Sequence, residues 1–351
     1  MSDLTLSTPL CKALGIKYPI ILAGMARASG GPLAAAVSNA GGLGCVGGLG
    51  YTPAQLQEII DDLKSNLTDK SLPFAIDLAL PKVGPGARKT NYDYTHGQLD
   101  ELIEVTIRNG ARLFVSAVGV PPKRVIDRLH AAGILVMNMV GHPKHAEKAL
   151  QAGVDLVCAQ GGEGGGHTGN IANSILIPAV VDVARRYRSP LTGEPAMVVA
   201  AGGIHDGRGL ASSLMQGALG VWVGTRFLAS QESGASNLHK EAVTTAGFDD
   251  TVRTLIVSGR PLRVRVNDYV RKWEEGQPEK IRELTDRGII PLAYDEENGV
   301  ETDRPFLMGQ VSAVIGDLPP AGSIVEGMVK QAVEQLKVGE GYLRPQVRSA
   351  L

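Results

Sequence analysis

The segment from Ala159 to Gly169 combines a run of glycines with one histidine, His167. Six of the nine residues from 161 to 169 are glycine, so this loop either adopts backbone angles that other residues avoid or lies against a ligand. An imidazole changes its charge near neutral pH, which suits a general acid or base. We therefore interpret His167 as a catalytic acid or base on a ligand-binding loop. The alternative is a flexible loop with a solvated histidine.

Two further glycine-containing segments, Ala200–Ile204 and Val223–Phe227, each follow an aliphatic run. In α/β barrels, backbone N–H groups at the turns after the last two strands often bind a phosphate, and glycine lets the backbone approach it. Together the segments predict a phosphate site; as the alternative, both are ordinary tight turns. A third segment, Leu22–Ala26, places small residues and Met25 where a flat aromatic ligand could lie, unless Met25 only fills the core.

The glycines Gly42, Gly44 and Gly47 match the dinucleotide-binding pattern GxGxxG, and Asp62 follows 20 residues after Gly42. That motif normally follows a strand and begins a helix, whereas this pattern follows a predicted helix and enters a predicted strand. We therefore interpret it as a tight turn. The signature motifs of P-loop ATPases, zinc proteases, serine hydrolases and EF-hands do not occur in the sequence.

These segments need elements to position them, and the sequence predicts a regular alternation of strands and helices. Short aliphatic runs predict eight strands, at 20–23, 43–46, 74–78, 112–116, 134–138, 155–159, 197–200 and 219–223. Helical spacing predicts helices at 31–40, 53–66, 97–109, 121–131, 143–152, 174–187 and 206–216, and a closing helix at 322–337. Such alternation forces parallel pairing, and eight units favour a (β/α)8 TIM barrel over an open, doubly wound sheet.

Residues 231–305 break this pattern because they are rich in charge. We expect a barrel domain made of residues 1–230 and 306–351, with a mainly helical insertion subdomain at 231–305 after the eighth strand. The insertion contains the basic run Arg260–Arg265 and a charged helical stretch from Arg271 to Arg287. We expect these basic residues to face solvent; the alternative is a specific contact with a phosphate or a partner.

The composition excludes several classes of protein. The 351 residues carry 35 basic and 36 acidic side chains, which argues against a nucleic-acid or acidic-membrane partner. No basic N-terminal region precedes an apolar run and no apolar run reaches 18 residues, so we expect a cytoplasmic protein; the final residues 349–351 resemble a peroxisomal signal only weakly. The three cysteines, Cys11, Cys45 and Cys158, fit neither a disulfide framework nor a metal site.

Taken together, these motifs resemble the nitronate monooxygenase family, formerly the 2-nitropropane dioxygenases, which are FMN-dependent TIM barrels. The resemblance covers nearly the whole chain, and its most specific part is the loop that contains His167. It rests on Pro19–Met25, the AGGLG at 40–44, the loop at 159–169, the AGGI at 201–204, the GTRF at 224–227 and Met308–Gln310.

The resemblance implies a role for each matching residue, with His167 as the catalytic histidine. It implies that the flavin ring lies against Gly24, Met25, Ala26, Gln160 and Gly165, that the phosphate lies against Gly202, Gly203, Gly224 and Thr225, and that Gly309, Gln310 and Ser312 return to the flavin edge. Two positions depart from the family: Asp77 stands where relatives usually have Asn, and Gly164 replaces the more usual Ala.

The resemblance also implies a reaction: oxygen oxidises an alkyl nitronate, and in some cases a neutral nitroalkane, to a carbonyl compound and nitrite without a nicotinamide. The partners would be the small nitro compound and oxygen. Two rivals remain: an FMN-dependent NAD(P)H enoyl-thioester reductase, and a barrel that binds a phosphate ligand without redox chemistry. An enzyme like IMP dehydrogenase needs an exposed nucleophilic cysteine, whereas Cys158 lies inside a predicted strand.

Overall fold

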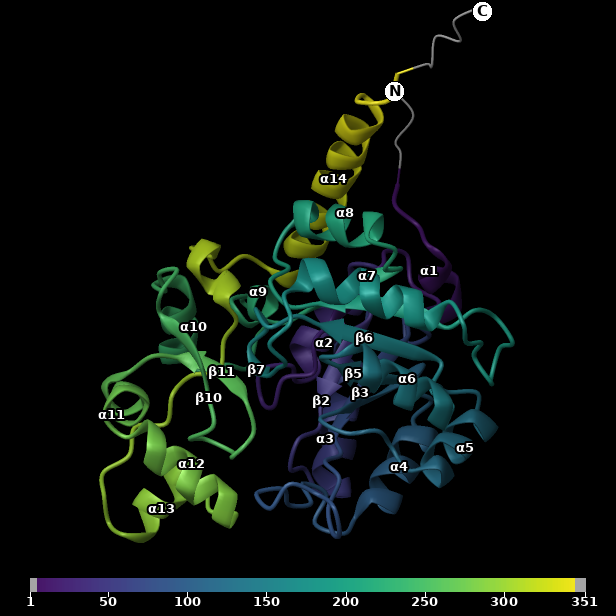
Figure 1. The fold of residues 1–351 in the computed structure, drawn as a ribbon. Coiled ribbons are helices and arrows are strands. Elements are labelled where there is room, and N and C mark those ends of the chain that lie inside the picture. The colour runs from purple at the N-terminus through teal and green to yellow at the C-terminus, as the bar shows by residue number, and fades with distance from the viewer. Residues whose placement is uncertain (1–4, 345–351) are drawn as a thin grey trace, which may run out of the picture.

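The structure, a computed structural model, describes residues 5–344, so the C-terminal tripeptide 349–351 lies outside the described residues. Its centre is a barrel of eight short parallel strands (Figure 1). These strands are β1 (Ile20–Leu22), β2 (Gly44–Gly47), β3 (Phe74–Ala79), β4 (Leu113–Ala117), β5 (Leu135–Val140), β6 (Leu156–Gln160), β8 (Met197–Ala201) and β9 (Gly220–Val223). All eight predicted strands are confirmed, with shifts of one or two residues at their ends.

The strands follow the order β1-β9-β8-β6-β5-β4-β3-β2, and β1 returns to β2 to close the ring. Closure depends on a short parallel bridge between Ile21 and Leu43, where the Leu22 N–H donates to the Leu43 carbonyl at 2.9 Å. The fold is therefore a TIM barrel rather than an open sheet. The glycines at 42–47 lie where the chain passes from helix α2 into strand β2. Glycine is required at position 44 because a Cβ there would lie 1.9 Å from the Ala34 carbonyl oxygen.

Helices surround the barrel and cover its N-terminal end. The outer helices are α2 (Gly31–Asn39), α3 (Pro53–Asn66), α4 (Leu99–Arg108), α5 (Lys123–Ala131), α6 (Pro143–Ala152), α7 (Asn173–Ala184) and α8 (Gly207–Met215). The closing helix α14 (Ala321–Glu340) lies along α8, because Gly207 has no side chain to separate them (Figure 1). At the N-terminal end, α1 (Pro9–Leu14) places Leu10 against Gly220.

Three polar or titratable side chains lie together inside the barrel: Cys45 on β2, Asp77 on β3 and Cys158 on β6. Burial raises the pKa of both thiols well above its usual value, and the charge of Asp77 raises it further. Neither cysteine is therefore a reactive thiolate, which disfavours the IMP-dehydrogenase-like alternative.

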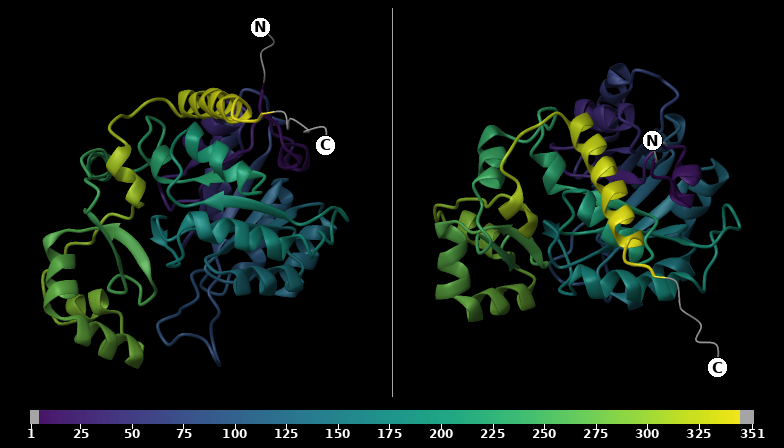
Figure 2. Two further views of the ribbon diagram at one scale, coloured as in Figure 1. Left: turned by 45° about the horizontal axis from the view of Figure 1, so that its top comes forward. Right: turned by 90° about the horizontal axis from the view of Figure 1, so that it is seen from above.

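After β9 and the short helix α9 (Thr225–Leu228), the chain continues beside the barrel through the segment that we interpret as the insertion (Figure 2). It consists of α10 (Asn237–Thr244), β10 (Thr251–Thr254), β11 (Leu262–Arg265), α11 (Asp268–Gly276), α12 (Pro278–Arg287) and α13 (Pro291–Glu297). Val270, Trp273 and Leu284 belong to its small apolar core. The charged helical stretch is interrupted at Gln277 because Pro278 begins a new helix.

The hairpin β10–β11 connects the insertion to the barrel, and the sequence analysis did not predict it. Strand β11 pairs antiparallel with β7 (Gly166–His167), a two-residue strand within the glycine-rich loop. In this pairing Leu262 lies opposite His167 and Arg263 lies opposite Gly166. The insertion therefore holds the backbone on both sides of the histidine.

No helix between residues 5 and 344 is both long and apolar enough to cross a bilayer. Within the same residues, no group of three or more His, Cys, Asp or Glu side chains is placed to hold a metal ion.

Candidate active site

The predicted glycine loops meet at the C-terminal end of the barrel. A Cβ on Gly202, after β8, would lie 2.9 Å from the carbonyl oxygen of Gly161, after β6. A Cβ on Gly165 would lie 2.6 Å from the backbone of Met308. Residues far apart in sequence are thus brought into contact here, and several of these contacts require glycine.

The C-terminal segment at Gly309 and Gln310 lies between the His167 loop and the turn after β9. The Gly309 N–H donates to Thr225 Oγ1 at 3.0 Å, and the Gln310 N–H donates to the Glu163 carbonyl at 2.9 Å. Gln310 begins the 3-10 helix η1 (Gln310–Val314), in which Ser312 is buried and donates to the Gly309 carbonyl. The segment therefore returns to the mouth of the barrel; its place at the flavin edge stays a prediction.

The turn after β1 forms another wall of the mouth. The Met25 N–H donates to Ser29 Oγ at 2.7 Å, and Ser29 returns a bond to the Met25 carbonyl. A Cβ on Gly224 would lie 3.6 Å from the Met25 sulfur, so the turns after β1 and β9 are adjacent. Gly24 and Met25 are half-buried and Ala26 is exposed.

The turns after β8 and β9 fit a phosphate group. Within residues 5–344 the backbone N–H groups of Gly203, Gly224 and Thr225 have no hydrogen-bond acceptor. Gly202 and Gly203 have φ angles of +91° and +73°, a conformation that other residues rarely adopt. Free N–H groups on turns without side chains are suitable donors to phosphate oxygens. The residues present therefore fit the phosphate of a flavin nucleotide.

Asp77 lies beneath the mouth with no partner for one of its carboxyl oxygens. The side chain is 8% exposed, and Oδ1 has no hydrogen bond. Burial raises the pKa of this carboxyl to about 8, so it carries a proton at neutral pH. A Cβ on Gly24 would lie 2.3 Å from Oδ2, which places the acid directly against the turn after β1. A protonated Asp donates one hydrogen bond, as the amide of the usual Asn also can.

His167 is held from two sides. Its carbonyl accepts a hydrogen bond from Gln160 Nε2 at 2.9 Å, and its ring Nε2 lies 2.9 Å from Ser258 Oγ of the insertion. Burial, followed by the positive charge of Arg260, lowers the pKa of the imidazole to about 4. The ring is therefore neutral at physiological pH, and the loop is ordered by pairing with β11 rather than freely flexible.

Gly164 has a structural consequence at this point. A Cβ at position 164 would lie 2.6 Å from Gln160 Nε2, the atom that donates to the His167 carbonyl. Glycine in place of the usual alanine leaves room for the Gln160 amide beside the loop. In this structure the Gln160 amide is thus turned towards the histidine backbone.

We expected the basic run Arg260–Arg265 to face solvent, and this prediction is wrong because none of its three arginines is fully exposed. Arg260 is half-buried, and its guanidinium donates to Asn91 Oδ1 at 2.8 Å and to the Val118 carbonyl at 3.2 Å. Arg263 Nε donates to the Gly162 carbonyl at 3.0 Å. Among the described residues, no carboxylate oxygen lies within 4.0 Å of either the Arg260 or the Arg263 guanidinium.

Arg260 makes the surroundings of His167 positive. Burial lowers the pKa of Arg260, and the nearby charge of Arg88 lowers it further. The Val118 carbonyl that accepts from Arg260 belongs to a β-branched residue with a φ of +72°, a costly conformation that tertiary contacts must maintain. Arg260, which has no carboxylate within 4.0 Å among the described residues, lies close enough to affect a neutral histidine and therefore favours an anionic ligand.

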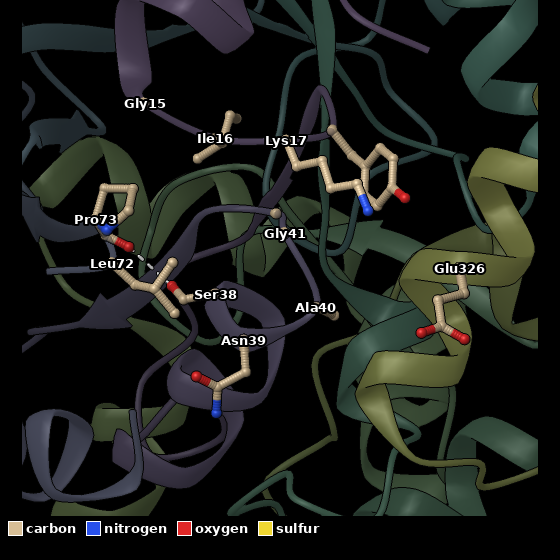
Figure 3. Close-up of a pocket in the computed structure, with 12 residues that line it drawn as sticks. Gly15, Ile16, Lys17, Ser38, Asn39, Ala40, Gly41, Leu72, Pro73 and Glu326 are labelled. Atoms are coloured by element: carbon tan, nitrogen blue, oxygen red, sulfur yellow. Dashed lines mark hydrogen bonds between the residues drawn. The ribbon is translucent and has the colours of Figure 1, made fainter. Parts of the chain in front are cut away.

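A separate hollow of about 400 Å³ lies at the other end of the barrel (Figure 3). It is lined by residues before β1 and β2, including Lys17, Tyr18 and Asn39, and by Glu326 of α14. None of the predicted site residues lines it. The N-terminal end of a TIM barrel typically contributes to stability rather than to catalysis, so we place the active site at the opposite end.

Comparison with known proteins gives the family. The model of the family described as nitronate monooxygenase matches residues 7–336. The chain belongs to the nitronate monooxygenase family. A probable nitronate monooxygenase of Staphylococcus saprophyticus is 33% identical over 94% of this chain and 98% of its own length. This membership shows a flavin-type oxidoreductase.

Other proteins that are similar to this chain are named for different activities. A (3aS,4S,5R,7aS)-5-hydroxy-7a-methyl-1-oxo-octahydro-1H-indene-4-carboxyl-CoA dehydrogenase of Mycobacterium tuberculosis is 33% identical over 96% of this chain and 99% of its own length. The structure of FabK from Thermotoga maritima superposes with a TM-score of 0.78 at 32% identity, covering 97% of this chain and 100% of that one. Membership of the family therefore leaves the substrate to be argued from the site.

Proposed function

We propose that this protein uses FMN to oxidise alkyl nitronates with oxygen, giving a carbonyl compound and nitrite. The observation that carries the proposal is the positive charge of Arg260 near a neutral His167, with no carboxylate of the described residues within 4.0 Å of that guanidinium. A nitronate is already an anion, so it needs a positive site and no removal of an α-proton. A histidine with a pKa of about 4 is a weak base for a neutral nitroalkane.

Each part of the mouth has a role in this proposal. The N–H groups of Gly203, Gly224 and Thr225 hold the FMN phosphate, and the turn at Met25 supports the ring. Arg260 attracts the nitronate, and His167 contacts its nitro group through a ring nitrogen. The chemistry that a bound flavin supplies is electron transfer from the nitronate to oxygen.

We propose FMN rather than a dinucleotide because the described residues offer one phosphate cradle. The dinucleotide-like pattern at Gly42–Gly47 enters strand β2 and packs against helix α2. It therefore offers no N–H groups at the start of a helix for a pyrophosphate.

A second candidate is the NAD(P)H-dependent reduction of an enoyl thioester. It is favoured by the relative that is named a carboxyl-CoA dehydrogenase and by the position of Arg88. Arg88 is exposed, has no carboxylate partner among the described residues, and donates to the Gly259 carbonyl at the edge of the mouth. An exposed cation there suits the phosphates of a coenzyme A ester.

The direct test compares an alkyl nitronate with the neutral nitroalkane of the same carbon skeleton. With the FMN-loaded protein, we expect oxygen consumption and nitrite release from the nitronate, at a kcat/KM at least about 100-fold above that for the nitroalkane. Comparable values for both forms would show that the enzyme removes the α-proton efficiently and would contradict the proposed role of His167. No oxygen consumption with any nitronate would reject the proposal itself.

A further inference from the structure

We propose that Ser258, in the turn between β10 and β11, is a positioning residue that fixes the tautomer of His167. Ser258 is 9% exposed, and its Oγ lies 2.9 Å from His167 Nε2. The two residues are 91 positions apart in the chain, so the contact exists only because the insertion folds against the barrel. The assignment of the tautomer does not depend on the proposed function, but the role of the imidazole at the active site does.

Counting hydrogens indicates which ring nitrogen is protonated. A serine hydroxyl has one proton to donate and two lone pairs. Ser258 Oγ lies 2.9 Å from His167 Nε2 but 3.4 Å from the Arg260 carbonyl, so its proton is donated to the nearer acceptor, the ring nitrogen. A neutral imidazole that accepts at Nε2 has a protonated Nδ1. The geometry therefore assigns the Nδ1–H tautomer to His167.

The remaining nitrogen, Nδ1, is open to the site. It has no hydrogen-bond partner within residues 5–344, and it is not among the atoms that are both buried and unpartnered. Ser258 thus leaves the proton on Nδ1 free to be donated to a nitro oxygen of the ligand. If the tautomer were reversed, Nδ1 would present a lone pair instead, which would repel an anionic nitro group.

The turn that contains Ser258 is held firmly. Gly259 has a φ of +64°, and a Cβ there would lie 2.5 Å from Thr90, so a side chain at this position would disrupt the turn. The Gly259 carbonyl accepts bonds from Thr90 Oγ1 at 3.3 Å and from Arg88 at 3.4 Å. On the next residue, the Arg260 guanidinium donates to Asn91 Oδ1. The long loop between β3 and α4 therefore fixes the serine in place.

The test is the protonation state of His167 in the FMN-loaded protein, measured by NMR with 15N-labelled histidine. A His167→Asn variant assigns the signals. We expect the wild type to show a protonated Nδ1 and an unprotonated Nε2. We expect Ser258→Ala to show a mixture of tautomers, and Ser258→Thr, which keeps the hydroxyl, to restore the single form.

Activity provides a second measurement. We expect Ser258→Ala to lower kcat for the nitronate at least about tenfold while the FMN dissociation constant stays within twofold of wild type, and Ser258→Thr to recover most of the loss. Ser212→Ala, which removes an exposed hydroxyl on α8, is the matched control and should change neither measurement.

Two results would overturn the inference. The first is an unprotonated Nδ1 in the wild type, and the second is an unchanged single tautomer in a folded Ser258→Ala variant. The NMR result does not depend on the substrate. A protein that shows the expected tautomers but oxidises no nitronate would therefore leave this inference intact while rejecting the proposed function.

Discussion

At the scale of single residues, the site depends on groups held in a neutral state. Asp77 retains its proton because burial provides no partner for its charge, and His167 lacks a proton because burial and Arg260 disfavour the imidazolium. The shift of Asp77 reverses its usual ionisation at neutral pH, whereas the shift of His167 removes the small charged fraction that a free imidazole has there. The positive charge of the mouth therefore comes from arginine.

Asp77 should make stability depend on pH. Its pKa in the folded protein is about 8 against 3.8 when unperturbed, so the folded state retains a proton that the unfolded state loses, and stability falls as pH rises between these values. We expect Asp77→Asn to remove this dependence. In urea unfolding of the FMN-free protein, the free energy of unfolding of the variant relative to wild type should rise by about 4 kcal/mol between pH 5 and pH 9. A gain that does not change with pH would show that Asp77 has a partner.

Arg260 should control both the histidine and the substrate. Arg260→Met keeps the apolar stem and removes the charge that lowers the pKa of His167. We expect NMR titration to show a higher pKa, shifted towards the usual value of about 6.5, and kinetics to show a KM for the nitronate raised about tenfold or more. Arg265→Met is the control, because Arg265 is already paired with Asp250 at 3.2 Å. Equal effects of the two substitutions would argue against a specific role for Arg260.

At the scale of elements, we expect the turns after β8 and β9 to need glycine for flavin binding but not for folding of the barrel. We expect Gly203→Val and Gly224→Val to weaken FMN binding at least about 100-fold, because a branched side chain occupies the space of a phosphate that accepts charge-assisted bonds. Circular dichroism should show an intact barrel, and equilibrium dialysis should show the loss of flavin.

The control for these variants is Gly193→Val. Gly193 has a φ of +72°, close to the +73° of Gly203, and an added Cβ would have no atom within 4 Å. This variant therefore carries the same backbone strain away from the mouth. If it lost flavin as Gly203→Val does, general destabilisation rather than a phosphate site would explain the result.

Elements also differ in how far the sequence predicts them. The barrel strands were predictable because each is a short buried aliphatic run followed by a helix, as in Leu156–Gln160 before the glycine loop. The hairpin β10–β11 was not, because β11 is stabilised by pairing with Gly166 and His167, far away in the sequence. Its alternation of Leu262 and Val264, both buried, with two arginines was the available signal.

At the scale of the whole molecule, the candidate site is built by two parts of the chain. The barrel supplies the glycine turns, Asp77 and the His167 loop, and these positions could be predicted from the resemblance. The insertion supplies Ser258 and Arg260, which sequence reasoning missed because their contacts depend on how the hairpin packs against the long loop at Thr90 and Asn91. The flavin-binding roles of the glycines stay predictions.

The central claim is that electrons reach the flavin from a nitronate and not from a nicotinamide. The most direct measurement is the absorption of the FMN-loaded protein mixed, without oxygen, with an alkyl nitronate or with NADPH. We expect the nitronate to bleach the flavin band within a few turnover times and NADPH to leave it unchanged. Rapid bleaching by NADPH, with none by any nitronate, would contradict the account and favour a thioester reductase.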